Sequence, residues 1–88
     1  MIRKHIVFTG AVQFVGFRWR ARKAANMFRC TGWCRNEADG SVTMEIQGTR
    51  IQICLALQAL RTGKQIRIDS MNVTYLNPIP EERGFRTE

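Results

Sequence analysis

The sequence predicts an α+β sandwich, a sheet with two helices packed on one of its faces. Residues 17–29 and 50–62 have apolar residues at helical spacing. Four other stretches either alternate apolar and polar residues or are rich in β-branched and aromatic residues, which is typical of strands. Strands and helices therefore follow one another in the order βαββαβ.

Residues 4–9, "KHIVFT", predict the first strand, and residues 10–16 predict the loop after it. A helix then begins at Phe17 and ends between Arg29 and Thr31. Apolar or small side chains at positions 17, 21, 24, 25 and 28 form one stripe of this helix. The other faces carry the basic residues Arg18, Arg20, Arg22 and Lys23.

Residues 30–36, "CTGWCRN", predict the second strand, and the Asp39-Gly40 pair predicts a hairpin turn. The third strand follows at residues 41–48. Val42, Met44 and Ile46 alternate with polar residues there, so we expect this strand to be half-buried, with one face in the core.

Residues 50–62 predict the second helix, which we expect to stop at Gly63. Residues 65–77 predict the fourth strand, and the slip in its alternation indicates a bulge near Ser70 and Met71. Pro78 and Pro80 end this strand, and residues 84–88 predict a short fifth strand at an edge. The expected core stripe of the second helix is Ile53, Cys54, Leu57 and Leu60.

The order βαββαβ usually gives the ferredoxin-like fold, an antiparallel sheet with both helices on one face. Eighty-eight residues suit one such domain, so we assign residues 1–88 to a single unit. The fold class does not fix the function, because it serves enzymes, metal carriers and RNA-binding modules alike.

Fourteen Lys and Arg residues against seven Asp and Glu give a net charge of +7, which favours anionic partners. No apolar run is long enough for a membrane span. The apolar run at the start of the chain is also too short for a signal peptide. We therefore expect a cytoplasmic protein, monomeric and without a membrane partner.

Three cysteines, Cys30, Cys34 and Cys54, lack the paired spacing of a zinc site, and His5 is the only histidine. We expect free and mostly buried thiols in a reducing compartment. The sequence predicts neither a metal site nor a cofactor.

Two stretches contain candidate site residues. The loop before the first helix has glycines at both ends, and the N–H groups of a helix N-terminus together with Arg18 can bind phosphate. Asn36, at the end of the second strand, can orient a water molecule or a substrate oxygen. The alternatives are an ordinary strand-to-helix connection with a surface arginine, and an asparagine that only begins the hairpin turn.

Taken together, "GAVQFVGFR", "GWCRN" and "DGSV" resemble the acylphosphatase family, whose pattern runs G-x-V-Q-G-V-x-F-R, G-W-V-x-N and D-G-[ST]-V. The likeness covers nearly the whole chain. It implies a ferredoxin-like sandwich that hydrolyses small acyl phosphates to a carboxylate and inorganic phosphate without a metal. By this resemblance Arg18 and Asn36 are catalytic, with Asn36 positioning the attacking water. The implied phosphate-binding loop consists of Gln13, Phe14, Val15, Gly16, Phe17 and Arg18.

Phe14 departs from the family pattern, which has glycine at this position. Its ring has three possible places: outward in solvent, along the acyl side of the pocket, or across the phosphate site. A blocked site would leave a catalytically impaired anion-binding domain, which is the alternative function. An RNA-binding module is a third hypothesis, but the third strand has no aromatic residue for stacking bases, so we expect only weak and non-specific attraction to nucleic acid.

Overall fold

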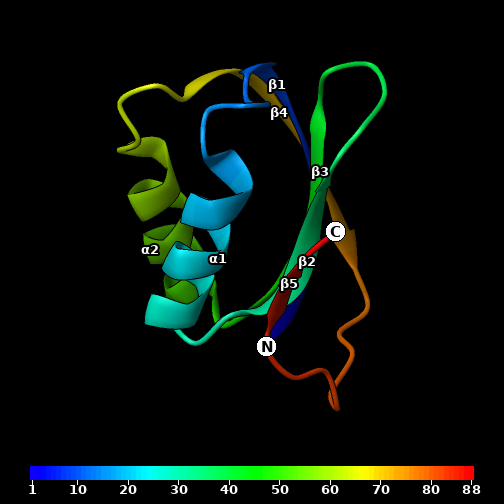
Figure 1. The fold of residues 1–88 in the computed structure, drawn as a ribbon. Coiled ribbons are helices and arrows are strands. Elements are labelled where there is room, and N and C mark those ends of the chain that lie inside the picture. Colours follow the sequence, from blue (N-terminus) through cyan, green and yellow to red (C-terminus); the bar gives the residue numbers. More distant parts are fainter.

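The computed structural model describes residues 1–88, which form a sheet with two helices packed on one of its faces (Figure 1). The first half of the chain has one helix and the second half the other, as the two apolar stripes predict. In chain order the elements are β1 (Ile2–Ala11), α1 (Phe17–Met27), β2 (Thr31–Asn36), β3 (Val42–Gly48), α2 (Arg50–Arg61), β4 (Arg67–Leu76) and β5 (Phe85–Thr87).

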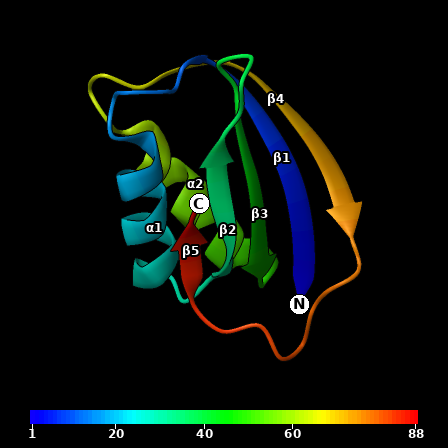
Figure 2. The same ribbon diagram turned by 45° about the vertical axis from the view of Figure 1, so that its right-hand side comes forward.

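The strands lie in the order β4-β1-β3-β2-β5 (Figure 2). The pairs β1–β3, β1–β4 and β2–β3 are antiparallel, which confirms the predicted ferredoxin-like fold. The expectation of an antiparallel sheet throughout was wrong at the edge, because β5 pairs with β2 in parallel. The long β4–β5 connection returns the chain to the end of the sheet where β2 begins, so β5 runs in the same direction as β2.

The predicted bulge in the fourth strand lies at Asp69, one residue before the predicted place. Thr9 pairs with Ser70, whereas Gly10 pairs with Ile68, so Asp69 has no partner in β1. The bulge bends β4 where β1 ends and the chain turns toward the first helix.

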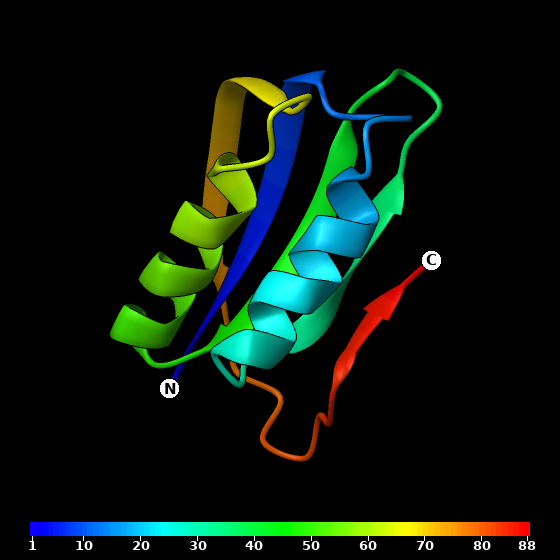
Figure 3. The ribbon, with the colours of Figure 1, turned by 60° about the vertical axis from the view of Figure 1, so that its left-hand side comes forward.

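The core lies between the helices and the sheet, and α1 and α2 run side by side across it (Figure 3). Cys30 and Cys34 are buried as predicted, but Cys54 is exposed and was wrongly placed in the core stripe. Ala56 is buried on that helix instead, because its side chain faces the core of the sandwich, whereas Cys54 lies on a side of the helix that is exposed. The fully buried large apolar residues include Ile6, Phe8, Val12, Phe17, Met44 and Leu60.

The other face of the sheet is also partly covered, which the alternation in β3 did not predict. Thr43 and Gln47 belong to the polar set of β3, yet they are only 4% and 3% exposed. Gln47 exchanges two hydrogen bonds with the main chain of Ile79, in the connection formed by residues 77–84. The expectation of a half-buried β3 was therefore wrong, because this connection packs on the face away from the helices.

Two connections meet at one end of the sandwich. The loop from β1 to α1 and the β2–β3 hairpin lie at the same end, and the N-terminus lies at the other (Figures 1 and 3). This end of the sandwich contains both stretches with candidate site residues. Neither helix has the length and apolar character needed to cross a membrane.

Candidate functional site

The loop of residues 12–16 presents unpaired main-chain donors at the start of α1. Gly16 is the N-cap residue with a φ of 77°, a left-handed conformation that glycine adopts without steric cost, and no side chain caps this end of the helix. None of the N–H groups of residues 13–19 donates to a main-chain acceptor. A helix N-terminus with unpaired N–H groups attracts anions through these groups and through the helix dipole.

Gln13 holds this loop against the β2–β3 hairpin. Its side-chain amide Nε2 donates to the carbonyl oxygens of Glu37 and Ser41, at 2.7 Å and 2.9 Å. Because Glu37 directly follows Asn36, this pair of hydrogen bonds fixes the loop relative to the end of β2. The side chain of Gln13 is therefore a tether between the two halves of the site.

Arg18, in the first turn of α1, is half-buried and held at one of its nitrogens. Its Nη1 donates to a main-chain oxygen of Glu88 at 2.8 Å, and the N–H of Glu88 donates to the carbonyl oxygen of Cys34 at 2.8 Å. A guanidinium has five N–H donors in a planar fork, so most of its donors stay available to a ligand. The contact with Glu88, directly after β5, orients the guanidinium and leaves its other donors free.

Asn36 reaches the same place from the last residue of β2. In the β2–β3 register it pairs with the core residue Val42, so its side chain lies on the face of the sheet that carries the helices. It lines, together with Arg18, a cavity of about 180 Å³ between the loop, α1 and β2. The cavity-lining residues are Val12, Phe14, Gly16, Phe17, Arg18, Trp19 and Asn36.

The structure thus brings together five of the seven predicted site residues. Gln13 and Val15 do not line the cavity: Gln13 is the tether and Val15 packs against the core. Trp19 lines the cavity and was missed by the sequence reasoning. The available signal was an aromatic residue directly after Arg18, in the first turn of an amphipathic helix.

The neighbouring titratable side chains are poorly suited to act as nucleophile or base. Burial raises the pKa of Cys34 to about 12, so its thiol is uncharged at neutral pH. The Glu37 carboxylate accepts a hydrogen bond from Thr43, which lowers its pKa, and it also contacts Arg35. Thr43 belongs to the face away from the helices, so this carboxylate is directed away from the cavity.

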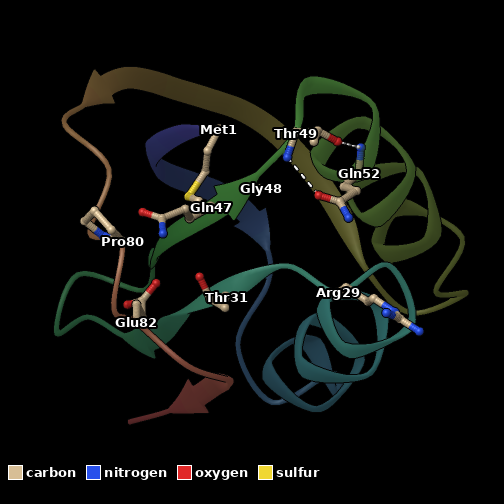
Figure 4. Close-up of a pocket in the computed structure, with 9 residues that line it drawn as sticks. All are labelled: Met1, Arg29, Thr31, Gln47, Gly48, Thr49, Gln52, Pro80 and Glu82. Atoms are coloured by element: carbon tan, nitrogen blue, oxygen red, sulfur yellow. Dashed lines mark hydrogen bonds between the residues drawn. The ribbon is translucent and has the colours of Figure 1, made fainter.

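A second depression of about 180 Å³ lies at the opposite end of the sandwich (Figure 4). Most of its polar side chains are already paired within the protein, although the buried Thr31 Oγ1 has no hydrogen-bond partner and the Arg29 side chain makes no hydrogen bond. Thr49 and Gln52 form a reciprocal capping box at the start of α2, and Glu82 is paired with Arg3. Such groups have little capacity left for a ligand, so the cavity beside Arg18 and Asn36 is the candidate site.

The comparison with known families identifies the family of the chain. A family model described as acylphosphatase matches residues 4–87. The chain belongs to the acylphosphatase family. This confirms the family that the motifs around Arg18 and Asn36 predicted.

Relatives and solved structures of this family match the chain almost end to end. An acylphosphatase of Geobacillus thermodenitrificans is 34% identical over 87 residues, which cover 98% of this chain and 93% of the relative. One of Salinibacter ruber is 37% identical over 79 residues, covering 89% and 83%. The crystal structure of the Bacillus subtilis acylphosphatase superposes with a TM-score of 0.90 at 25% identity, covering 100% of this chain and 99% of that one. These likenesses support a hydrolase that acts on acyl phosphates.

Proposed function

We propose that the cavity beside Arg18 and Asn36 is the active site for hydrolysis of acyl phosphates to a carboxylate and inorganic phosphate. The observation that carries the proposal is the convergence of three kinds of group on one cavity. They are the unpaired N–H groups at the start of α1, the guanidinium of Arg18 and the amide of Asn36. The first two suit the phosphoryl oxygens, and the third suits a water molecule.

The reaction requires positioning and charge stabilisation more than strong acid–base chemistry. The oxygen of water attacks phosphorus and forms a new P–O bond, while the P–O bond to the acyl oxygen breaks and the carboxylate leaves with the electron pair. The proton lost by water passes to a phosphoryl oxygen of the substrate, so a dianionic acyl phosphate and water give a carboxylate and dihydrogen phosphate. In this scheme Asn36 orients the water, and Arg18 with the loop N–H groups stabilises the phosphoryl oxygens.

We propose further that the reaction needs no metal ion and that the protein acts as a cytoplasmic monomer without a specific nucleic-acid partner. No group of three or more His, Cys, Asp and Glu side chains in the chain could hold a metal. The face of the sheet away from the helices, where RNA-binding modules of this fold stack bases, is partly occupied by residues 77–84, and Arg35 lies over the ring of Trp33 there.

Hydrolysis of acetyl phosphate by the purified protein tests the proposal, in the presence and absence of a chelator. We expect Arg18→Lys to lower kcat/KM by about 100-fold or more, because lysine lacks the planar fork. We expect Asn36→Ala to lower kcat by about tenfold or more, because the water loses its orienting group. Arg22→Lys and Asn72→Ala are matched controls, since both residues are exposed and lie outside the cavity.

Two outcomes would contradict these assignments. Full turnover in Arg18→Ala would mean that the phosphate binds elsewhere, and an unchanged kcat in Asn36→Ala would remove Asn36 from the mechanism. The impaired anion-binding domain remains the alternative hypothesis. It requires an inactive wild type that gains activity in Phe14→Gly.

A further inference from the structure

Phe14 combines a strained backbone with an exposed ring. Its φ is 61°, in the left-handed region that side chains with a Cβ rarely adopt, and it is 95% exposed. The ring therefore gives the fold almost no burial in return for this conformation. Strain without a packing benefit, next to a candidate site, points to a role in binding.

Its exposure excludes one of the three places that were open for the ring, the place across the phosphate site. A ring that is 95% exposed does not fill the anion-binding concavity of its own loop. Phe14 nevertheless lines the same cavity as Arg18 and Asn36. It therefore extends outward from the edge of the site, where the group attached to the phosphate would emerge.

Trp19 provides a second exposed aromatic ring on this cavity. It lies in the first turn of α1 and is 64% exposed, although a large apolar side chain on a surface helix is usually directed to the core. Lys23 Nζ lies 5.0 Å from the centre of its ring, a cation–π contact that restrains the indole. One cavity thus has a polar part, with Arg18 and Asn36, and an aromatic part.

We propose that Phe14 and Trp19 bind the acyl group of the substrate and give the protein a preference for acyl phosphates with a planar aromatic acyl group. This inference rests on the proposed function, since it concerns the part of the substrate beyond the phosphate. Aromatic rings stack on one another or meet edge to face, and both exposed rings present such surfaces. An acetyl group has no aromatic surface with which to make such contacts.

The test compares kcat/KM for benzoyl phosphate and acetyl phosphate in the wild type, Phe14→Gly and Trp19→Ala. We expect the ratio of the two constants to fall by about tenfold in each variant. Met27→Ala is the matched control, because Met27 is an exposed apolar residue of the same helix that does not line this cavity. A ratio that stays at the wild-type value in both variants would overturn the proposal.

A binding measurement separates this inference from the proposed function. By calorimetry, phenyl phosphate should bind the wild type about tenfold more tightly than inorganic phosphate, and Phe14→Gly should remove most of that difference. Equal affinities in the wild type would overturn the aromatic site while leaving acyl phosphate hydrolysis intact. An inactive wild type that gains acetyl phosphate turnover in Phe14→Gly would show that the ring obstructs the site. If neither protein hydrolyses either substrate, the proposed function fails, and the inference fails with it.

Discussion

Arg3 and Arg18 lie near opposite ends of the same sandwich, and their surroundings differ in kind. Arg3, on β1, is 1% exposed, and four of the five N–H donors of its guanidinium are used within the protein. It donates to Glu45 at 2.9 Å, to Gln47 at 3.2 Å and to the two carboxylate oxygens of Glu82 at 2.7 Å and 3.1 Å. Arg18 is half-buried and makes one hydrogen bond, to a main-chain oxygen of Glu88.

The difference shows how one side chain can serve either the fold or a ligand. At Arg3 the donors are used within the protein, and the result is a clamp that fastens the β4–β5 connection to β1 and β3. At Arg18 a main-chain oxygen fixes the direction of the group while most of its donors stay unpaired. A buried arginine with carboxylate partners has a structural role, whereas a held but unsaturated one beside a cavity suits an anion.

Replacing Arg3 should have the largest effect on stability. We expect Arg3→Met to lower the free energy of unfolding by about 3–5 kcal/mol, because the part-buried carboxylate of Glu82 loses its partner and that of Glu45 keeps only His5. Arg18→Met should cost about 1 kcal/mol, the value of one hydrogen bond, while activity toward acetyl phosphate is lost. Urea unfolding and the kinetic assay, applied to both variants, measure the two effects.

Glu82→Gln keeps this experiment informative if Arg3→Met does not fold. It retains a hydrogen-bond acceptor for Arg3 but removes one charge, so a smaller loss in the same direction is expected. If Arg3→Met has the same urea midpoint of unfolding as the wild type, the clamp does not stabilise the fold.

The sequence predicted the parts of the fold that depend on local periodicity. Buried side chains at Phe17, Ala21, Ala24 and Ala25 confirm the stripe expected for α1. The clamp at Arg3 was not foreseen, because alternation in β1 and β3 says which side chains share a face but not what covers that face. Its partner Glu82 is far along the chain, in a proline-containing connection with no repeating pattern.

For the candidate site, the motifs predicted which residues lie near one another, but they did not predict the contacts that each residue makes. Arg18 and Asn36 do line one cavity, although neither residue type nor spacing alone distinguished them from a surface arginine and a turn asparagine. The tethering role of Gln13 depends on carbonyl groups in a hairpin more than twenty residues later, a position that only the folded chain defines. The strain at Phe14 is likewise visible only in the backbone conformation.

Acid should weaken the Arg3 clamp. Burial raises the pKa of Glu45, but hydrogen bonds from His5 and Arg3 outweigh it and leave the pKa below its ordinary value of 4.5. Burial also raises the pKa of Glu82, but the hydrogen bonds from Arg3 together with the positive charges of Arg3 and Arg86 outweigh it and leave this pKa lowered. Groups with a lowered folded-state pKa stabilise the protein above their ordinary pKa, and this contribution is lost as the pH falls through the lowered value.

The measurement is urea unfolding of the wild type and Arg3→Met between about pH 7 and pH 3. The difference in stability between the two should be constant above about pH 5 and should narrow below the ordinary carboxylate pKa, because protonated carboxyls gain little from Arg3. A difference that stays constant down to pH 3 would assign the stabilisation to the packing of the Arg3 stem instead of its charge.

A smaller loss of stability than at Arg3 is expected for the contact that holds the Arg18 end of the molecule together. Gln13→Ala removes two hydrogen bonds to the carbonyl groups of Glu37 and Ser41, and we expect a loss of about 1–2 kcal/mol in stability. The loop and the end of β2 then lose their link, so kcat should fall by about tenfold while Arg18 still binds phosphate and KM changes little. Gln58→Ala, at an exposed glutamine on α2, is the control for general destabilisation. If kcat is unchanged in Gln13→Ala while stability falls as expected, the tether serves only the fold and the alignment of Arg18 with Asn36 comes from the strands alone.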